Sequence, residues 1–258
     1  MIVTTTAKPS ARALEQARRL SDELSAALKA RGNLTVNKLM TLSRDKRLIV
    51  VTEEEVRYYD GQSDTPLYFH PSMAFVRVKR LRRGETDPLI QLSGCKEGDR
   101  VIDCTAGLAS DSLVFSYAAG PTGAVTAIES EPVLCALVRE GLAGYQTSLP
   151  DVNEAMRRIE MKCDHHMEYL TGLPDKSVDI VYFDPMFRQP INESSSMEPL
   201  RSIANMDALS GKVIEQAKRV ARKSVVLKEH QASGEFARLG FERRHVNTSK
   251  IAYGVIQL

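Results

Sequence analysis

The chain has 258 residues, of which 43% are hydrophobic and 26% are charged, and its formal net charge is +2. This length suits one large domain with a smaller one, and the composition is typical of a globular protein rather than a disordered chain. The apolar runs are too short to cross a membrane, and residues 1–10 lack the basic flank and apolar stretch of a signal peptide, so we expect a cytoplasmic protein.

The first 70 residues predict a small α/β domain. Residues 2–6 read as a strand, and apolar side chains at helical spacing predict a helix from about residue 10 to residue 30. Further strands are expected at 47–51 and 56–60, with Asp60-Gly61 marking a turn, and the segment 66–70 is a possible additional strand. A basic bridging segment, residues 71–97, follows this domain.

Strands and helices then alternate through residues 98–258. Strands are expected at 100–107, 124–129, 159–164, 178–184 and 224–229, with helices at 110–119, 132–145 and 206–221. Residues 241–258 read as a closing hairpin. Alternation of this kind predicts a mostly parallel sheet covered on both faces, with the hairpin as an antiparallel edge.

Four of the predicted strands end in an acidic residue. In a parallel α/β sheet, ligands bind at the carboxyl ends of the strands, so these positions are candidates for a binding site. The first strand ends at Asp103 and leads through Thr105 and Gly107 to Ser110 and Asp111. The other three strands end at Glu129, Asp164 and Asp184. Each acid alone could merely cap a helix or a turn, but four on one sheet edge favour a ligand site.

The character of these residues favours one class of ligand. A dinucleotide site would carry GxGxxG, whereas here the loop has only Gly107, and acids stand where phosphates would lie. Carboxylates repel a pyrophosphate and attract a cation, and Glu129 suits the two hydroxyls of a ribose. We expect Asp164 to accept a hydrogen bond from an adenine amino group and His165 to border the ligand. The pattern indicates S-adenosylmethionine.

The same residues carry a family resemblance. The order DCTAGLASD (103–111), AIE (127–129), KCD (162–164) and YFDPMF (182–187) resembles class I S-adenosylmethionine-dependent methyltransferases, with a Rossmann-like fold. Over residues 70–258 the chain is similar to the RsmJ family, whose members methylate a guanosine amino group in small-subunit ribosomal RNA. The family's DATAGLGRD, ER and DPMF correspond to Asp103–Asp111, Glu129-Ser130 and Asp184–Phe187, with Ala109 and Ser110 in place of Gly and Arg. Ser130 replaces an arginine, and Asp164-His165 replaces a pair of serines.

The DPMF motif suggests how the chemistry is carried out. The lone pair of an exocyclic amine is delocalised into the base, so a carboxylate that accepts a hydrogen bond from the amine would assist methyl transfer. Asp184 is the expected carboxylate, and Phe187 is the expected platform on which a flipped base would stack. Asp184 could instead cap a turn or contact only the cofactor, and Phe187 could instead close the core.

A basic segment is the expected contact with RNA. Its cations could bind phosphates near the target nucleotide, together with Arg188 and a lid formed by residues 192–197. The basic residues are Arg77, Lys79, Arg80, Arg82 and Arg83. Lys228 could also face the site, or it could only end a strand. The alternatives are a methyltransferase for a small molecule or protein, or a non-catalytic ribosome-assembly factor.

No metal is expected from the cysteines and histidines. The cysteines include no CxxC pair, and no histidine lies at zinc-ligand spacing from two of them. Adjacent His165 and His166 would not present both rings to one metal from a helix face. We therefore expect reduced thiols. The four cysteines are Cys95, Cys104, Cys135 and Cys163.

Overall fold

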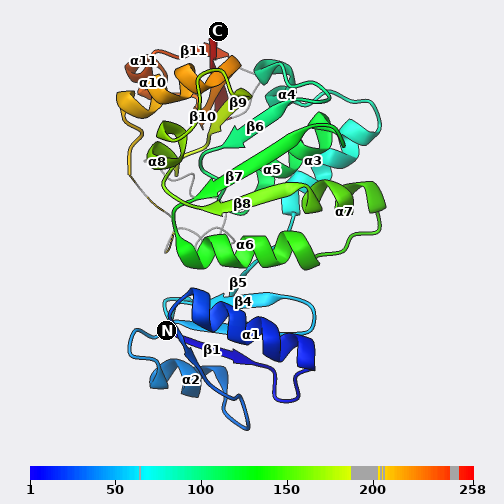
Figure 1. Ribbon diagram of the computed structural model, residues 1–258, viewed down its shortest axis with the longest axis vertical. Helices are drawn as coiled ribbons and strands as arrows, with labels where there is room; N and C mark the ends of the chain where they lie inside the picture. Colours follow the sequence, from blue (N-terminus) through cyan, green and yellow to red (C-terminus); the bar gives the residue numbers. More distant parts are fainter. Residues whose placement is uncertain (64, 187–202, 204, 206, 245–249) are drawn as a thin grey trace.

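Two β-sheets, one in each of two stacked units, organise the chain (Figure 1). The computed structural model describes residues 1–63, 65–186, 203, 205, 207–244 and 250–258. Predicted features that lie elsewhere, including Phe187, Arg188 and the proposed lid at 192–197, are outside the described residues. Within the described part, no helix combines the length and apolarity needed to cross a membrane.

The N-terminal unit is a five-stranded sheet with a helix on each face. Its strands are β1 (Ile2–Thr5), β2 (Ala27–Leu28), β3 (Leu48–Val51), β4 (Val56–Tyr59) and β5 (Leu67–Tyr68), and their order is β2-β1-β3-β4-β5. Its helices are α1 (Ala11–Glu23) and α2 (Val36–Leu42). Successive residues of β3 point to opposite faces, so Ile49 packs on the α1 side, whereas Leu48 packs with Leu39 of α2.

Helix α1 is shorter than the sequence pattern predicted. Ser10 caps its start by accepting a hydrogen bond from the Ala13 amide, as expected for a serine at this position. The helix ends at Glu23, and Ser25 adopts a left-handed conformation with φ of 48°. The chain then reverses and pairs β2 in parallel with β1. Hydrophobic spacing alone does not reveal this local reversal.

The basic bridging segment contains two helices that the sequence analysis did not identify. They are α3 (Ser72–Arg82) and α4 (Pro88–Ser93). Asp87 caps α4 through the Leu89 amide, Pro88 occupies the first turn, and Gly94 ends the helix in a left-handed conformation. One buried apolar cluster extends through both units and this segment, so the core shows no break at residues 70 or 98. The domain limits at these residues therefore stay a prediction.

The second unit is built on a seven-stranded sheet. Five parallel strands are β6 (Arg100–Asp103), β7 (Ala124–Glu129), β8 (Ile159–Cys163), β9 (Val178–Phe183) and β10 (Ala221–His230), and the antiparallel strands β11 (Glu242–Arg244) and β12 (Ile251–Gln257) close the edge. The order is β11-β12-β10-β9-β6-β7-β8. The strand order reverses between β6 and β9, which creates the switch point where ligands bind in such sheets.

Helices cover both faces of this sheet. They are α5 (Ser110–Ala119), α6 (Pro132–Gly144), α7 (Pro150–Arg157), α8 (His166–Thr171), α10 (Gly211–Val220) and α11 (Glu235–Leu239). Along fully buried β9, Ile180 and Tyr182 face the cluster that includes α3 and α5, whereas Val181 and Phe183 face α8 and α10. The predicted mostly parallel sheet with an antiparallel hairpin is confirmed.

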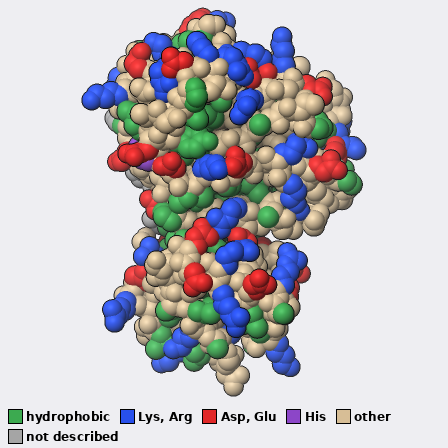
Figure 2. All heavy atoms as spheres, viewed as in Figure 1, with side chains coloured by type: hydrophobic (Ala, Val, Ile, Leu, Met, Phe, Trp, Pro, Cys, Tyr) green, Lys and Arg blue, Asp and Glu red, His purple; other side chains and the backbone are tan. Residues whose placement is uncertain are grey.

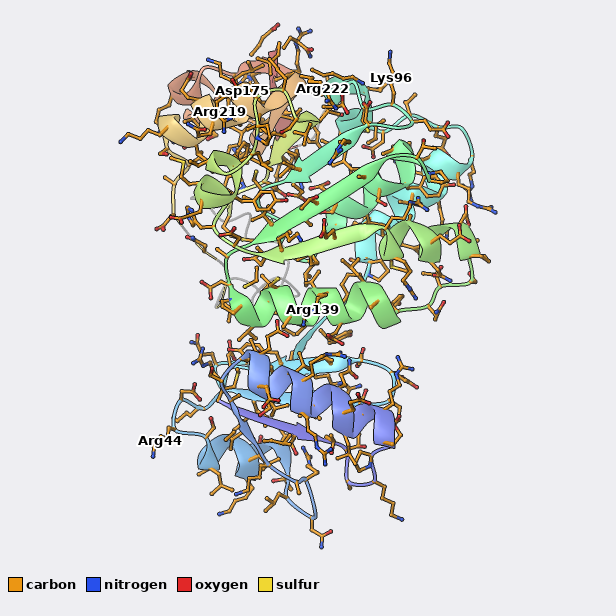
Figure 3. All side chains as sticks on the ribbon, viewed as in Figure 1. Arg44, Lys96, Arg139, Asp175, Arg219 and Arg222 are labelled. Carbon is orange, nitrogen blue, oxygen red and sulfur yellow. The ribbon has the colours of Figure 1, made fainter. Side chains whose placement is uncertain are left out.

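Helix α6 lies between the two units (Figure 1). Arg139 of α6 points towards the N-terminal unit, where its guanidinium forms two hydrogen bonds with the Glu23 carboxylate (Figure 3). Gly141 lets Phe69 approach the helix so closely that a Cβ at this position would lie 2.1 Å from the Phe69 Cβ. The two units therefore pack directly against each other at this helix.

Candidate active site

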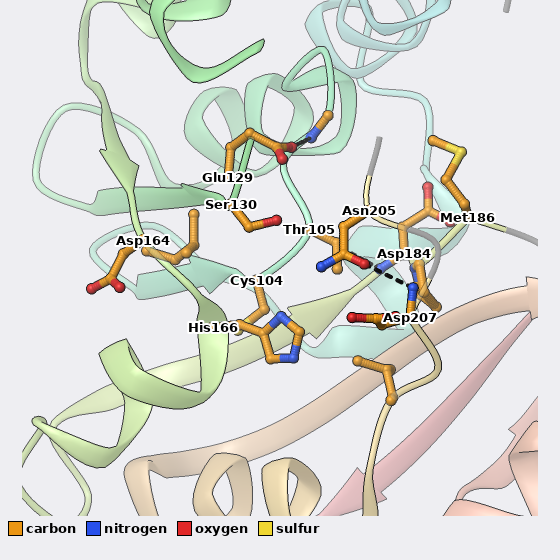
Figure 4. Close-up of a pocket in the computed structure, with 14 residues that line it drawn as sticks. Cys104, Thr105, Glu129, Ser130, Asp164, His166, Asp184, Met186, Asn205 and Asp207 are labelled. Carbon is orange, nitrogen blue, oxygen red and sulfur yellow. Dashed lines mark hydrogen bonds between the residues drawn. The ribbon is translucent and has the colours of Figure 1, made fainter. Parts of the chain in front are cut away.

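A cavity opens at the carboxyl ends of β6, β7, β8 and β9, the edge where the sequence predicted a ligand site (Figure 4). It contains about 540 Å³ of space free of protein atoms, including the part open to solvent. Its lining residues are Cys104, Thr105, Gly107, Ile128, Glu129, Ser130, Asp164, His166, Asp184, Pro185, Met186, Asn205, Asp207 and Leu209.

The loop after β6 is shaped by Asp103 from beneath the cavity. The buried Asp103 carboxylate accepts hydrogen bonds from the Thr105 amide at 3.1 Å and the Ser112 hydroxyl at 2.5 Å. Burial raises the pKa of Asp103 to about 7. Gly107 has a left-handed φ of 50° and contributes to the lining. Asp103 therefore holds the loop, whereas Thr105 and Gly107 face the cavity.

Glu129 ties the end of β7 to this loop. Its carboxylate accepts hydrogen bonds from the Gly107 and Glu131 amides, each at 3.0 Å. Burial raises the pKa of Glu129, although these amide donors work in the opposite direction. Ser130 follows in the lining. The structure thus brings Glu129 and Ser130 into one cavity with the β6 loop, and a carboxylate there can accept hydrogen bonds from ligand hydroxyls.

The end of β8 places the two adjacent histidines differently. The Asp164 carboxylate accepts a hydrogen bond from the His165 amide, and Asp164 lines the cavity. His165 instead caps α8, because its Nδ1 accepts a hydrogen bond from the Met167 amide. The cavity is lined by His166, whose ring packs edge-on against Phe183. Burial and neighbouring His165 lower the pKa of His166 to about 4, so its imidazole is neutral near pH 7.

Asp184 stands at the cavity edge, directly after β9. Its amide donates a hydrogen bond to the Thr105 hydroxyl at 2.5 Å, and its side chain is 25% exposed. The Lys228 ammonium donates to Oδ2 of Asp184 at 2.7 Å. Burial raises the pKa of Asp184 to about 6, with Lys228 opposing the rise and Asp111 adding to it. The carboxylate is therefore mostly ionised at neutral pH and can accept a hydrogen bond.

Asp111 lies behind Asp184 in a buried group of charges. Its carboxylate accepts hydrogen bonds from Lys228 and the Tyr182 hydroxyl, both at 2.8 Å, and from the Arg77 guanidinium. Burial works to raise the pKa of Asp111, but Lys228 and Arg77 hold it well below its usual range. Neither Asp111 nor Ser110 is among the residues that line the cavity.

The five cations of the basic segment differ in their surroundings. Arg77 points inwards from α3 and binds the Asp87 carboxylate with two donors as well as Asp111. The others lie nearer the surface. Arg80 pairs with Glu85, Arg82 pairs with Asp151, Lys79 lies over the ring of Phe75, and Arg83 is the C-cap residue of α3. Acidic and basic side chains are interspersed on the face in view in Figure 2.

The cavity also contains residues that the sequence analysis did not select. They are Cys104, Ile128, His166, Pro185, Met186, Asn205, Asp207 and Leu209. Pro185 and Met186 could have been predicted as lining residues from the sequence, because they belong to the DPMF motif. Asn205 and Asp207 precede α10 and carry no sequence signal, since only the fold returns this segment to the cavity. Among the described residues, no group of three or more histidine, cysteine or acidic side chains could hold a metal ion.

The donor set fits a nucleoside that carries a positive charge. Carboxylates from three strand ends, Glu129, Asp164 and Asp184, line one cavity, and the lining residues that the structure describes include no lysine or arginine. This arrangement is unfavourable for a pyrophosphate and favourable for hydroxyls, an amino group and a sulfonium. S-adenosyl-L-methionine carries all of these groups, so the residues present fit this cofactor.

The chain matches known proteins along most of its length. The family model described as "Putative SAM-dependent methyltransferase" matches residues 34–246. An uncharacterized protein of Bacillus subtilis, YpiP, is 41% identical over 256 residues, which cover 99% of each chain. A solved SAM-dependent methyltransferase from Neisseria gonorrhoeae superposes with a TM-score of 0.65 at 16% identity, covering 100% of this chain and 96% of that one, which shows the shared fold.

More distant relatives have a named substrate. A ribosomal RNA small subunit methyltransferase J from Acinetobacter baumannii is 28% identical over 173 residues, which cover 60% of each chain. Another from Laribacter hongkongensis is 31% identical over 150 residues, covering 56% of this chain and 52% of the relative. The chain thus spans little more than half the length of these relatives. With its strand order, its cavity and a family match through residues 34–246, the chain belongs to the S-adenosyl-L-methionine-dependent methyltransferases.

Proposed function

We propose that the protein transfers a methyl group from S-adenosyl-L-methionine to an exocyclic amino group of a nucleotide, namely a guanosine of small-subunit ribosomal RNA. The observation that carries the proposal is the position of Asp184, which leads into Pro185 and Met186 at the edge of the cavity. The names of the ribosomal RNA methyltransferase relatives support the RNA substrate. Such an enzyme would meet its substrate in the cytoplasm.

Asp184 would assist the amine. The cofactor supplies a methyl group bound to a positively charged sulfur. An exocyclic amine has to regain its lone pair from the ring before it can attack, and a carboxylate that accepts one N–H localises that lone pair. The half-buried position of Asp184 strengthens this hydrogen bond relative to one in water. The proline that follows restrains the backbone that carries the carboxylate.

The other lining residues would hold the cofactor. We assign the ribose hydroxyls to Glu129, with neighbouring Ser130, and the adenine amino group to Asp164. Gly107 and Thr105 would let the cofactor approach the backbone of the β6 loop closely. Asp103 would support this loop from beneath, and we further propose that Ser110 and Asp111 support the start of α5. His165, as the cap of α8, would act through the orientation of Asp164 and His166.

The substrate would be held by the surface near α3. Lys79, Arg80, Arg82 and Arg83 could bind phosphates. Arg80 and Arg82 would first exchange their present carboxylate partners, which is feasible because exposed ion pairs are weak in water. Arg77 would serve this surface indirectly by anchoring α3 to Asp87 and Asp111. Phe187 as a stacking platform and Arg188 as a phosphate contact remain part of the proposal, and both lie outside the described residues.

The test is a methyl-transfer assay on ribosomal subunits from a strain that lacks this gene. The protein is incubated with labelled S-adenosyl-L-methionine and small subunits, with large subunits as the matched control. The label is then followed into RNA and protein fractions after extraction. We expect label in the RNA of the small subunit alone. Label confined to protein, or equal label in both subunits, would contradict the proposed substrate.

A further inference from the structure

Lys228 is a largely buried cation next to the proposed catalytic carboxylate. It lies in β10, between β9 and β12, and its side chain is 16% exposed. Its ammonium bridges two carboxylates, Asp111 at 2.8 Å and Asp184 at 2.7 Å. Removing an ammonium from water is costly unless carboxylates surround it, so this position requires both partners.

The bridge is part of a longer series of charges. It runs from Asp87 through Arg77, Asp111 and Lys228 to Asp184. Three acids and two bases leave one excess negative charge when all are ionised. Arg77 and the Tyr182 hydroxyl also bind Asp111, so this carboxylate accepts hydrogen bonds from three side chains. The contact with Asp111 therefore restrains the Lys228 ammonium, which stays next to the Asp184 carboxylate.

The groups that face Asp184 act in opposite directions. Burial raises the pKa of Asp184, Lys228 lowers it, and Asp111 raises it. Tyr182 and Tyr253 are neutral near pH 7, because burial raises the pKa of each, that of Tyr253 to about 12. Asp103 lies behind the β6 loop and interacts with both Asp111 and Asp184. Among these neighbours Lys228 is the group that favours the ionised carboxylate.

We propose that Lys228 is a positioning residue for methyl transfer, which orients the Asp184 carboxylate through Oδ2 and holds a positive charge beside it, so that the carboxylate can accept a hydrogen bond from the substrate amine. The inference rests on the proposed function, because it assigns Lys228 a role in the same reaction. Lys228 acts through Asp184 and need not touch the substrate. The bond to Oδ2 leaves the second carboxylate oxygen outside this contact.

The chain offers a matched control on the same strand. Lys223 of β10 pairs with the buried Asp99 carboxylate at 2.5 Å, and it is not among the residues that line the cavity. Lys223→Met therefore removes a lysine–aspartate pair from the same strand without changing the charges around Asp184. Lys228→Arg keeps the charge at the site, whereas Lys228→Met removes it.

The first readout is the pH dependence of kcat/KM on small ribosomal subunits, which reports ionisations of the free enzyme. In the wild type, kcat/KM should rise as pH increases through about 6, because Asp184 ionises there. In Lys228→Met the midpoint of this rise should move up by about one pH unit or more. Below the midpoint the variant should then be about tenfold less active than the wild type, and this difference should disappear at higher pH. Lys228→Arg should restore most of the activity, and Lys223→Met should keep the wild-type midpoint.

A second variant separates this effect from loss of stability. Asp111→Asn also breaks a buried ion pair, but it removes a charge that raises the pKa of Asp184. Its midpoint should therefore move down, opposite to that of Lys228→Met. A decrease of kcat/KM by one factor at every pH in Lys228→Met, or shifts in the same direction in both variants, would overturn the role of Lys228.

A readout without substrate separates the inference from the proposed function. The carboxyl ¹³C resonance of Asp184, identified by its loss in Asp184→Asn, can be titrated by NMR in the free protein. A higher midpoint in Lys228→Met than in wild type and Lys223→Met supports the inference even if no RNA is methylated, in which case only the proposed substrate fails. An unchanged midpoint would overturn the inference even if the RNA is methylated.

Discussion

The two ends of the central strands β9 and β10 carry the same kinds of residue in different surroundings. At the amino end, Asp179 pairs with Arg222 (Figure 3), and Lys223 pairs with Asp99. The side chains of Arg222 and Lys223 are 41% and 39% exposed. At the carboxyl end, Lys228 is more deeply buried and is shared between two carboxylates beside a cavity.

This difference changes the chemistry of the two aspartates. Burial works to raise the pKa of Asp179, but Arg222 and the Arg100 amide leave it lowered. At the other end of β9, burial raises the pKa of Asp184 to about 6 despite Lys228. An acid with a dedicated partner is a structural element, whereas an acid poised near neutral pH at a cavity can exchange hydrogen bonds with a ligand.

The most direct way to break this contrast is to neutralise one aspartate at each end. Asp184→Asn should lower methyl transfer by on the order of 10²–10⁴-fold, because the amine loses its ionised acceptor, while cofactor affinity changes little. Asp179→Asn should keep kcat and lose stability instead. Steady-state kinetics and calorimetric cofactor binding measure these effects. Comparable activity in both variants would contradict the assignment of the catalytic end.

A second pair of variants tests the cofactor side of the carboxyl end. Glu129→Ala should weaken S-adenosyl-L-methionine binding by about 1–3 kcal/mol, because charge-assisted hydrogen bonds to the ribose and the tie to Gly107 are lost. Glu160→Ala on β8 removes an exposed glutamate that pairs with Lys162, and it should leave the affinity unchanged. Titration calorimetry measures the affinity of each variant for S-adenosyl-L-methionine. Equal affinities in the two variants would refute the ribose assignment.

The buried Asp103 should make stability depend on pH in a defined direction. Its pKa is raised from 3.8 to about 7, so between these values the folded state holds more protons than the unfolded state. This contribution is present below pH 3.8 and is lost as pH rises through about 7. Urea unfolding of wild type and Asp103→Asn between about pH 5 and 8 should differ in slope by up to about 1.4 kcal/mol per pH unit. Parallel curves would argue against a raised pKa.

The smallest expected effect concerns the loop at the carboxyl end. Ala109 adopts a left-handed conformation with φ of 55°, which glycine tolerates better than alanine. Ala109→Gly should therefore stabilise the protein by up to about 1 kcal/mol, whereas Ala119→Gly at the last residue of α5 should destabilise it by a similar amount. Thermal unfolding measures the change in stability of each variant relative to the wild type. Destabilisation by both variants would show that Ala109 is not strained.

The strands and the edge of the site could be predicted from sequence because both follow from local patterns. The run 178–183 is apolar enough to be a central strand, and its end fixes where Asp184 lies. Side-chain direction could not be predicted for α3, since basic residues occur on several of its faces and only packing turns Arg77 inwards. Likewise the adjacent histidines gave no indication that His166, rather than His165, would line the cavity.

The pairing of Lys228 with two acids depends on tertiary structure alone. Asp111 is 117 positions from Lys228 in sequence, and the sheet brings them together. From sequence, Lys228 could either face the site or only end a strand, and the structure shows that β10 continues to His230 and that Lys228 reaches Asp184. Long-range contacts of this kind carry no periodicity, so only the folded arrangement reveals them.

The most direct test of the central claim is to identify the methylated nucleoside. Small subunits lacking the modification are labelled with the wild-type protein and S-adenosyl-L-methionine, the RNA is digested to nucleosides, and the product is analysed by mass spectrometry. We predict one methyl group on the exocyclic amine of guanosine. A methyl group on a ribose hydroxyl or a ring carbon would contradict the proposal, because the hydrogen bond assigned to Asp184 comes from an exocyclic N–H, which neither of these atoms carries.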